Sequence, residues 1–216
     1  MAYRKTEFVE RKRLETRARI VEAATSLVRV AGWRGCVLKT VAQRAGISTG
    51  SLYTHFTKIS DLYTEAYNVI ATGEYAVIAE IAKGDEPPLE RLTTAIDTFT
   101  RRAIRGRVQA YAMIGEPVAP EVEANRQRHR RLLAGLLETI IRDGMDDGAF
   151  ATQDPVCSSA CILGALNETM IMRLEPEAIT APNQGSKLRE EVRHFCLRAV
   201  QSPASTTRQS NNKVPA

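Results

Sequence analysis

Short hydroxyl side chains gather in one segment of this 216-residue chain, between residues 49 and 56. Thr49, Ser51 and Thr54 are interleaved there with Leu52 and Phe56, which lie four residues apart and therefore share one face of a helix. Hydroxyl groups suit hydrogen bonds to base edges and phosphates, and a threonine methyl suits contact with thymine. A short helix with an apolar back and this polar front predicts a surface that lies against DNA.

The residues around this segment predict a helix-turn-helix over about 38–62. Val41, Ala42 and Ala45 form the packed side of a first short helix, with alanines small enough for a close helix crossing. Gly46 stands where the chain turns and where a positive φ costs little without a Cβ. Ser48 or Thr49 is expected to cap the second helix by accepting from backbone N–H groups of its first turn.

Residues 15–65 resemble the TetR family of transcriptional regulators. The resemblance rests on residues at fixed offsets: Thr40, Val41, Ala42, Ala45, Gly46, Ile47, Ser48, Gly50, Leu52, Tyr53, His55 and Phe56, followed by Lys58, Asp61 and Leu62. Two positions depart from the family pattern, because Thr54 replaces a second Tyr or another bulky residue and Ile59-Ser60 replaces acidic or small residues. The resemblance implies a homodimeric, ligand-responsive DNA-binding protein, most often a repressor.

Side-chain type and the family pattern together give the predicted DNA-contacting set. The set is Lys39, Thr40, Arg44, Thr49, Gly50, Ser51, Tyr53, Thr54, His55 and Lys58. The resemblance places Tyr53 and His55 on the sugar-phosphate backbone, although Tyr53 could instead pack and His55 could instead cap a helix. The second helix carries no Arg or Asn, the usual bidentate base readers, so specificity is expected to use hydroxyl contacts, apolar contacts or DNA shape.

Charge supports the same interpretation. Residues 1–62 contain 12 Lys and Arg against 5 Asp and Glu, whereas the other residues contain 18 against 20. A basic module gains affinity for DNA when it neutralises phosphates and releases counterions. The alternative is that these Arg side chains simply lie on solvated helix faces.

The sequence predicts an all-α fold. Apolar periodicity indicates helices over about 11–31, 59–83, 89–103, 108–115, 120–143, 156–174 and 187–200, in addition to the helix-turn-helix, and no segment alternates like a strand. We expect a DNA-binding head at residues 1–62, a helical effector-binding and dimerisation body at 63–201 and a disordered tail at 202–216. The residues before Arg11 are expected to be a flexible basic arm or a frayed end.

The body is expected to enclose a largely apolar cavity for a small-molecule effector. The predicted liners are Phe99, Tyr111, Met113, Leu137, Asn167, Met170 and Met172, each of which could equally be an ordinary core residue. Asn167 is the most distinctive, because its amide interrupts an otherwise apolar helix. Basic residues at 101–107 and 126–131 either meet an anionic ligand such as an acyl-coenzyme A or lie in solvent.

The last two helices are candidates for the dimer surface. The helix over 156–174 carries small residues (Ser158, Ser159, Ala160, Gly164 and Ala165) that permit close approach, and the family resemblance favours pairing of the C-terminal helices across a two-fold axis. Cys157 and Cys161 lie four residues apart on this helix. They are expected to be buried apolar cysteines, the commoner case, with a thiol switch or soft-metal site as the alternative.

Two other functional classes remain open from the sequence. A non-specific DNA-binding protein without an effector would not need so large a helical body. An all-helical enzyme would need a nucleophile–base pair, paired carboxylates or a metal set, and the three His residues show no ligand spacing. No cofactor and no metal ion are expected. Neither a signal peptide nor a run of roughly 20 apolar residues is present, so no membrane partner and a cytoplasmic location are expected.

Overall fold

The computed structural model describes residues 2–174 and 184–201, which form helices and no strand. The helices are α1 (Ala2–Gly35), α2 (Leu38–Ala45), α3 (Thr49–His55), α4 (Ile59–Lys83), α5 (Pro88–Arg105), α6 (Arg107–Ile114), α7 (Pro120–Asp146), α8 (Pro155–Leu174) and α9 (Gln184–Val200). The predicted all-α fold is confirmed. The predicted tail, 202–216, lies outside the described residues.

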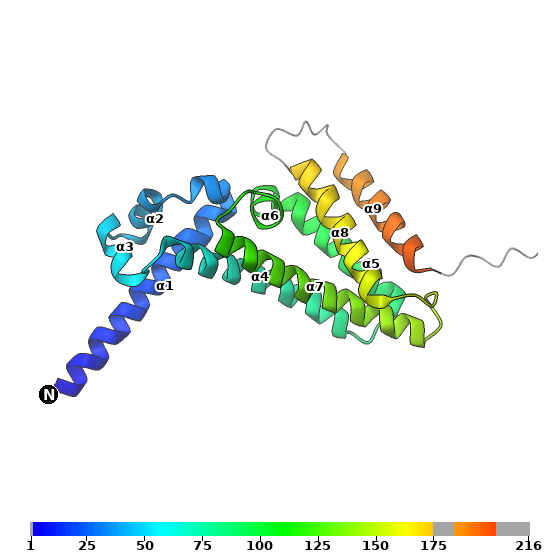
Figure 1. Cartoon of the computed structure of the whole chain (residues 1–216), viewed down its shortest axis with the longest axis horizontal. Helices are drawn as coiled ribbons and strands as arrows, with labels where there is room; N and C mark the ends of the chain where they lie inside the picture. The colour runs from blue at the N-terminus through cyan, green and yellow to red at the C-terminus, as the bar shows by residue number, and fades with distance from the viewer. Residues whose placement is uncertain (1, 175–183, 202–216) are drawn as a thin grey trace, which may run out of the picture.

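Helices α1–α3 form a head at one end of an elongated molecule, α5–α9 form the body at the other, and α4 runs from one to the other (Figure 1). One buried cluster joins α1–α3 with the first half of α4, through Leu62, Ala66 and Ile70, and a second joins its last turns with the body, through Ile78 and Ala82. The predicted boundary at residue 62 falls inside α4. Because α4 contributes to both cores, a tilt of this helix must move the head relative to the body.

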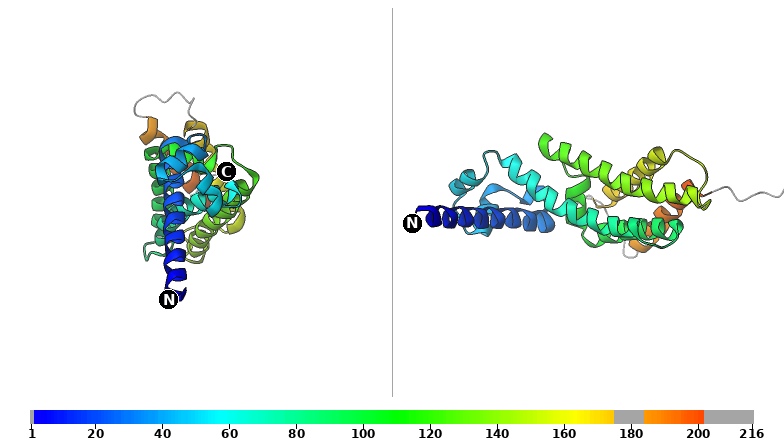
Figure 2. Two further views of the ribbon diagram at one scale, coloured as in Figure 1. Left: turned by 90° about the vertical axis from the view of Figure 1, so that its left-hand side faces the viewer. Right: turned by 90° about the horizontal axis from the view of Figure 1, so that it is seen from below.

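The first helix differs from its predicted bounds at both ends. It begins at Ala2 rather than near Arg11, and its first turns extend away from the other helices in both further views (Figure 2). Residues 7–15 are exposed, so no packing marks the start of this helix in the apolar pattern. At the other end Gly32 has φ 67°, and a further helical turn follows where a plain turn was predicted. Trp33 in that turn packs on α4 and α6.

The head and the body meet at a buried carboxylate. Glu116, 3% exposed, accepts the backbone N–H groups of Trp33 and Arg34, each at 2.8 Å. The Trp33 indole N–H donates to Ala112 O at 2.9 Å, and Arg126 donates to the carbonyls of both Ala112 and Glu116. We call these residues, with Gly32, the head–body junction.

Small differences elsewhere follow from packing rather than periodicity. Val69 belongs to the apolar stripe of α4 but is 48% exposed, because no helix covers that side. Helix α7 continues to Asp146, three residues beyond its predicted end, and Gly148 (φ 72°) makes the turn. By length and composition α8 could cross a membrane, but it packs against α6, α7 and α9 as a core helix does.

Gly32→Ala is expected to destabilise the protein more than Gly148→Ala. Both glycines have positive φ, which costs an L-residue about 1–2 kcal/mol. A Cβ at Gly148 would meet open space, whereas one at Gly32 would lie 2.6 Å from Glu116 Oε2. Urea unfolding should therefore show a loss of about 2–5 kcal/mol for Gly32→Ala. Equal losses in the two variants would contradict the close contact at the junction.

Candidate functional site

The second helix of the motif, α3, presents its polar side to solvent. Ser48 caps α3 by accepting from the Ser51 N–H at 3.2 Å, and Leu52 and Phe56 are buried in the head core. Gly46 has φ 68° and donates its N–H back to α2, which closes the turn as predicted. Exposed on the outer side are Thr49, Gly50, Tyr53 and Thr54, with Ser51 and His55 partly exposed.

Several of the predicted hydroxyl donors already have partners within the chain. Thr54 Oγ1 donates to Ser51 O at 2.7 Å, and Thr40 Oγ1 donates to Val37 O at 2.7 Å. Ser51 Oγ lies 2.8 Å from Ser48 Oγ. A phosphate oxygen can only accept, so Thr40 and Thr54 would need to exchange these bonds to donate to DNA. Thr49 and Tyr53 carry no such bond in the described part of the chain.

Basic side chains lie around α3. Lys39 in the first turn of α2, Arg44 in its last turn and Lys58 at the start of α4 are all exposed. Partial burial, followed by the charges of Arg13 and Arg17, lowers the pKa of His55. The His55 ring is therefore neutral at neutral pH in the free protein, and the positive charge around α3 comes from the Lys and Arg residues.

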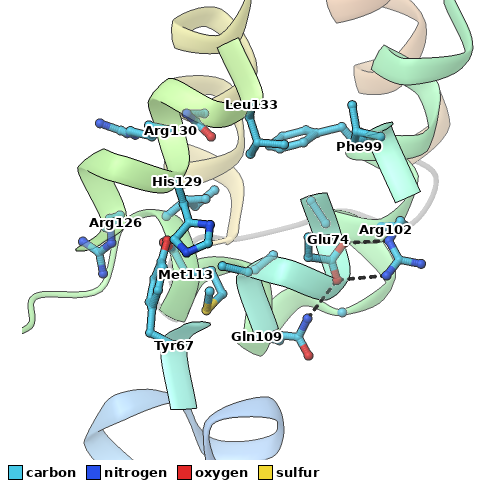
Figure 3. A pocket seen from close by; sticks show the side chains of 17 residues that line it. Tyr67, Glu74, Phe99, Arg102, Gln109, Met113, Arg126, His129, Arg130 and Leu133 are labelled. Atoms are coloured by element: carbon cyan, nitrogen blue, oxygen red, sulfur yellow. Dashed lines mark hydrogen bonds and ion pairs between the residues drawn. The ribbon is translucent and has the colours of Figure 1, made fainter. Parts of the chain in front are cut away.

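The body encloses a cavity of about 100 Å³ between α4, α5, α6, α7 and α8 (Figure 3). Its apolar wall includes Tyr67, Ala71, Ile78, Phe99, Ala103, Ala110, Met113, Ile114 and Leu133. Its polar lining consists of Glu74, Arg102, Gln109, Arg126, His129, Arg130 and Asn167. A largely apolar space with a few polar groups is the usual form of a small-molecule site.

The polar residues at the exposed side of the cavity are mutually bonded. Arg102 donates to both oxygens of Glu74, at 2.7 and 2.9 Å, and Gln109 donates to Glu74 Oε1 at 3.2 Å. The bond to Glu74 is the main cause that raises the pKa of Arg102. This cluster ties α4, α5 and α6 together beside the opening, and its two charges cancel.

A second polar group joins α4 to α7 on the cavity's other side. His129 Nε2 lies 3.0 Å from Asn68 Oδ1, which also accepts from Asn125 at 2.6 Å. The His129 ring lies beside the ring of Tyr67, whose other neighbour is Trp33 of the head–body junction. Burial, and then the charge of Arg128, lowers the pKa of His129, so this ring is neutral at neutral pH.

The structure brings together some of the predicted effector residues and separates others. Phe99, Met113 and Asn167 line the main cavity. Tyr111 lines a different cavity beside Gly32 and Glu116, and Leu137 lines a small one between α5, α7 and α8. Met170 is fully buried beside Tyr111 and lines none of these three cavities, and Met172 is 66% exposed.

Tyr67 and Glu74 on α4 and His129 on α7 were missing from the predicted effector set. All three line the cavity, and His129 does so although it lies in a charged run of the sequence. Of the basic groups considered for an anionic ligand, Arg102, Arg126 and Arg130 contribute to the lining. A sequence signal existed only for α4, where Glu74 follows the apolar stripe at a position that faces α5.

The prediction that Cys157 and Cys161 are buried is wrong. Both are exposed, because they lie on the side of α8 that no other described helix covers, whereas Cys36 and Cys196 are the buried cysteines. A hydrogen bond to Cys161 is the main cause that raises the pKa of Cys157. Within residues 2–174 and 184–201 no three His, Cys, Asp or Glu side chains gather as a metal site would require.

Comparison with known families identifies both parts of the chain. Residues 20–66 match the model of bacterial regulatory proteins of the tetR family, and residues 85–171 match the tetracyclin repressor-like C-terminal domain. The two matches together span more than half of the chain and correspond to the head and to most of the body.

Individual relatives agree with the family models. The chain is 24% identical over 135 residues to the HTH-type transcriptional repressor KstR2 of Mycobacterium tuberculosis. The aligned region covers 59% of this chain and 68% of that protein. The fold of this chain resembles that of Bacillus subtilis FadR in complex with stearoyl-CoA, with a TM-score of 0.70 and 16% identity. The match covers 85% of this chain and 99% of that one. The fold also resembles that of RolR in complex with resorcinol, with a TM-score of 0.66, 18% identity, and coverage of 88% of this chain and 90% of that one.

These matches agree with the exposed polar front of α3 and the enclosed cavity of the body, and they point to a regulator rather than to an enzyme. The chain is a DNA-binding transcriptional regulator and belongs to the TetR family.

Proposed function

We propose that the protein is a cytoplasmic, homodimeric repressor that leaves a palindromic operator when a small, largely apolar molecule enters the cavity of the body. One observation carries the proposal: α4 starts at the end of the DNA-binding motif and supplies one wall of the cavity through Tyr67, Ala71, Glu74 and Ile78. A ligand that displaces this wall therefore displaces α3. Release requires that the ligand bind the DNA-incompetent state more tightly.

The head–body junction supports the same coupling. Arg126 lines the cavity and also donates to Ala112 O and Glu116 O, while Glu116 accepts from the last turn of α1. Tyr67 lines the cavity and stacks on Trp33, with ring centroids 6.5 Å apart. The cavity is thus connected to the head through α6 and α7 as well as through α4.

Dimerisation is proposed through α8 and α9. The uncovered side of α8 carries Cys157, Ala160, Cys161 and Gly164, small residues that let another helix approach closely. On α9, Phe195 is 58% exposed, an unusual position for a large aromatic side chain in a monomer. Two copies of this surface would form a four-helix bundle and set the two heads for successive major grooves, about 34–36 Å apart.

Selection of random duplex DNA at physiological salt tests the operator proposal. The wild-type chain should enrich a palindrome with half-sites about one helical turn apart. Lys58→Ala should weaken binding to all sequences and lower the salt slope by about 1, because Lys58 is expected to neutralise one phosphate. Lys83→Ala, at the opposite end of α4, is the matched control and should leave binding unchanged. A folded dimer that enriches no motif would instead indicate a non-specific DNA-binding protein.

Gly164→Glu should convert the dimer into a monomer. Gly164 is an exposed helical glycine with open space around its Cβ position, so the monomer tolerates the larger side chain while the proposed interface does not. Gly135→Glu on α7 is the matched control, because that glycine is also helical, exposed and unhindered. Sedimentation velocity should show a monomer for the first variant only; a dimer for Gly164→Glu would exclude the α8 face.

A further inference from the structure

The cavity contains a buried amide without a partner. Asn167 is 4% exposed and lines the cavity, yet its side chain makes no hydrogen bond to any residue within 2–174 and 184–201. A buried amide has two donors and an acceptor, and leaving them unsatisfied is costly. Asn167 lies mid-helix among apolar neighbours, including Leu163, Leu166 and Met170, where a leucine would pack with no such cost. The amide is therefore best explained by a polar group that enters the cavity.

A hydrogen-bond acceptor of the cavity belongs to His129. Its Nε2 lies 3.0 Å from Asn68 Oδ1, and a carbonyl oxygen only accepts, so Nε2 carries the proton. In a neutral imidazole Nδ1 is then an acceptor, and it has no partner among the described residues. Asn167 on α8 thus offers donors to the cavity and His129 on α7 offers an acceptor. A hydroxyl group both donates and accepts, so its chemistry matches a donor and an acceptor on opposite helices.

The charges of the cavity favour a neutral ligand. Glu74 and Arg102 form a two-bond ion pair, and Arg126 pairs with Glu123 at 2.8 Å. Arg130 lines the cavity, but Figure 3 shows that its side chain, like that of Arg126, extends away from Phe99. The Nε atoms of Arg126 and Arg130 are buried without a partner, but both side chains extend away from the apolar wall, so an anion beside that wall would not meet either guanidinium directly.

Size limits the part of the ligand that is enclosed. The cavity measures about 100 Å³, and an engineered cavity of about 150 Å³ in another protein binds benzene. Tyr67, Phe99, Met113 and Leu133 supply aromatic, sulfur and aliphatic surface on its walls. The space and the walls suit one six-membered ring.

We propose that the cavity recognises a small neutral ring compound through one hydroxyl group, which accepts from the Asn167 amide and donates to His129 Nδ1. This inference rests on the proposed function, since it names the chemical class of the effector that binds the same cavity. Asn167 supplies the specificity, because the apolar walls would accept the ring with or without its hydroxyl.

Three probes of similar size test the inference by isothermal titration calorimetry with the full chain and without DNA. Phenol carries the hydroxyl, toluene replaces it with a methyl group, and benzoate replaces it with an anion. The wild-type protein should bind phenol about tenfold more tightly than toluene, the effect of one hydrogen bond gained at a buried site. Benzoate should bind more weakly than phenol.

Asn167→Leu should abolish the preference for phenol while leaving toluene affinity within about twofold. The same variant should melt at a higher temperature than wild type without ligand, because it removes the unsatisfied amide. Asn167→Ala also removes the amide and should lose the same preference. It replaces Asn167→Leu in the test if the leucine variant does not fold. Gln153→Leu is the matched control, since its amide lies outside the cavity and donates to Ala151 O and Val200 O, and it should keep the preference.

Several outcomes would overturn the inference. Equal wild-type affinities for phenol and toluene, or a preference that survives in both Asn167 variants, would remove Asn167 as the recognition group. Benzoate as the tightest probe would make Arg130 the recognition group, and absence of binding by all three probes would exclude a ring of this size. Phenol that binds through Asn167 without releasing the operator would contradict the proposed function and leave this inference intact.

Discussion

The carboxylate of Glu116 joins the two parts of the molecule, and the rest of the structure depends on this contact. Its oxygens accept the two backbone N–H groups that follow Gly32, so the end of α1 is bonded to the segment between α6 and α7, more than 80 residues away. Arg126 bonds the carbonyl of the same residue. Leaving such a buried acceptor without its partner costs about 1–3 kcal/mol, and more when the group is charged. The head therefore keeps its contact with α6 and moves together with it.

This contact determines how a change in the body reaches the head. The cavity shares Tyr67 and Met113 with the core that holds the head, and Tyr67 stacks on Trp33 at the junction. A ligand would thus act on two connections: the wall of α4 that leads directly to α3, and the α6–α7 segment that holds α1. Two connections at different positions on the head suit a rigid-body rotation of the head relative to the body.

Local features of the sequence were sufficient to predict most elements but not the contacts between them. Gly46, Ser48, Leu52 and Phe56 determine the turn and the orientation of α3 by themselves, and Pro87-Pro88 determines where α4 ends. Glu116 carries no such signal, because its role depends on a backbone that is distant in sequence. The same holds for Glu74 and His129, which face the cavity only through the crossing of α4, α5 and α7. The exposure of Cys157 and Cys161 depends on which side of α8 remains uncovered, and periodicity alone does not identify that side.

Three features of the chain are physically incomplete, and each requires a different kind of partner. The front of α3 places hydroxyl and aromatic groups in solvent with basic residues around them, which suits a polyanion with grooves. The side of α8 that no described helix covers exposes small, largely apolar residues, which permit close approach of another helix. The amide of Asn167 is buried inside the body and lines a cavity between its helices, a space too small for DNA or a second subunit. A small molecule is the kind of partner that suits this third feature, and that argument depends on neither the dimer nor the operator.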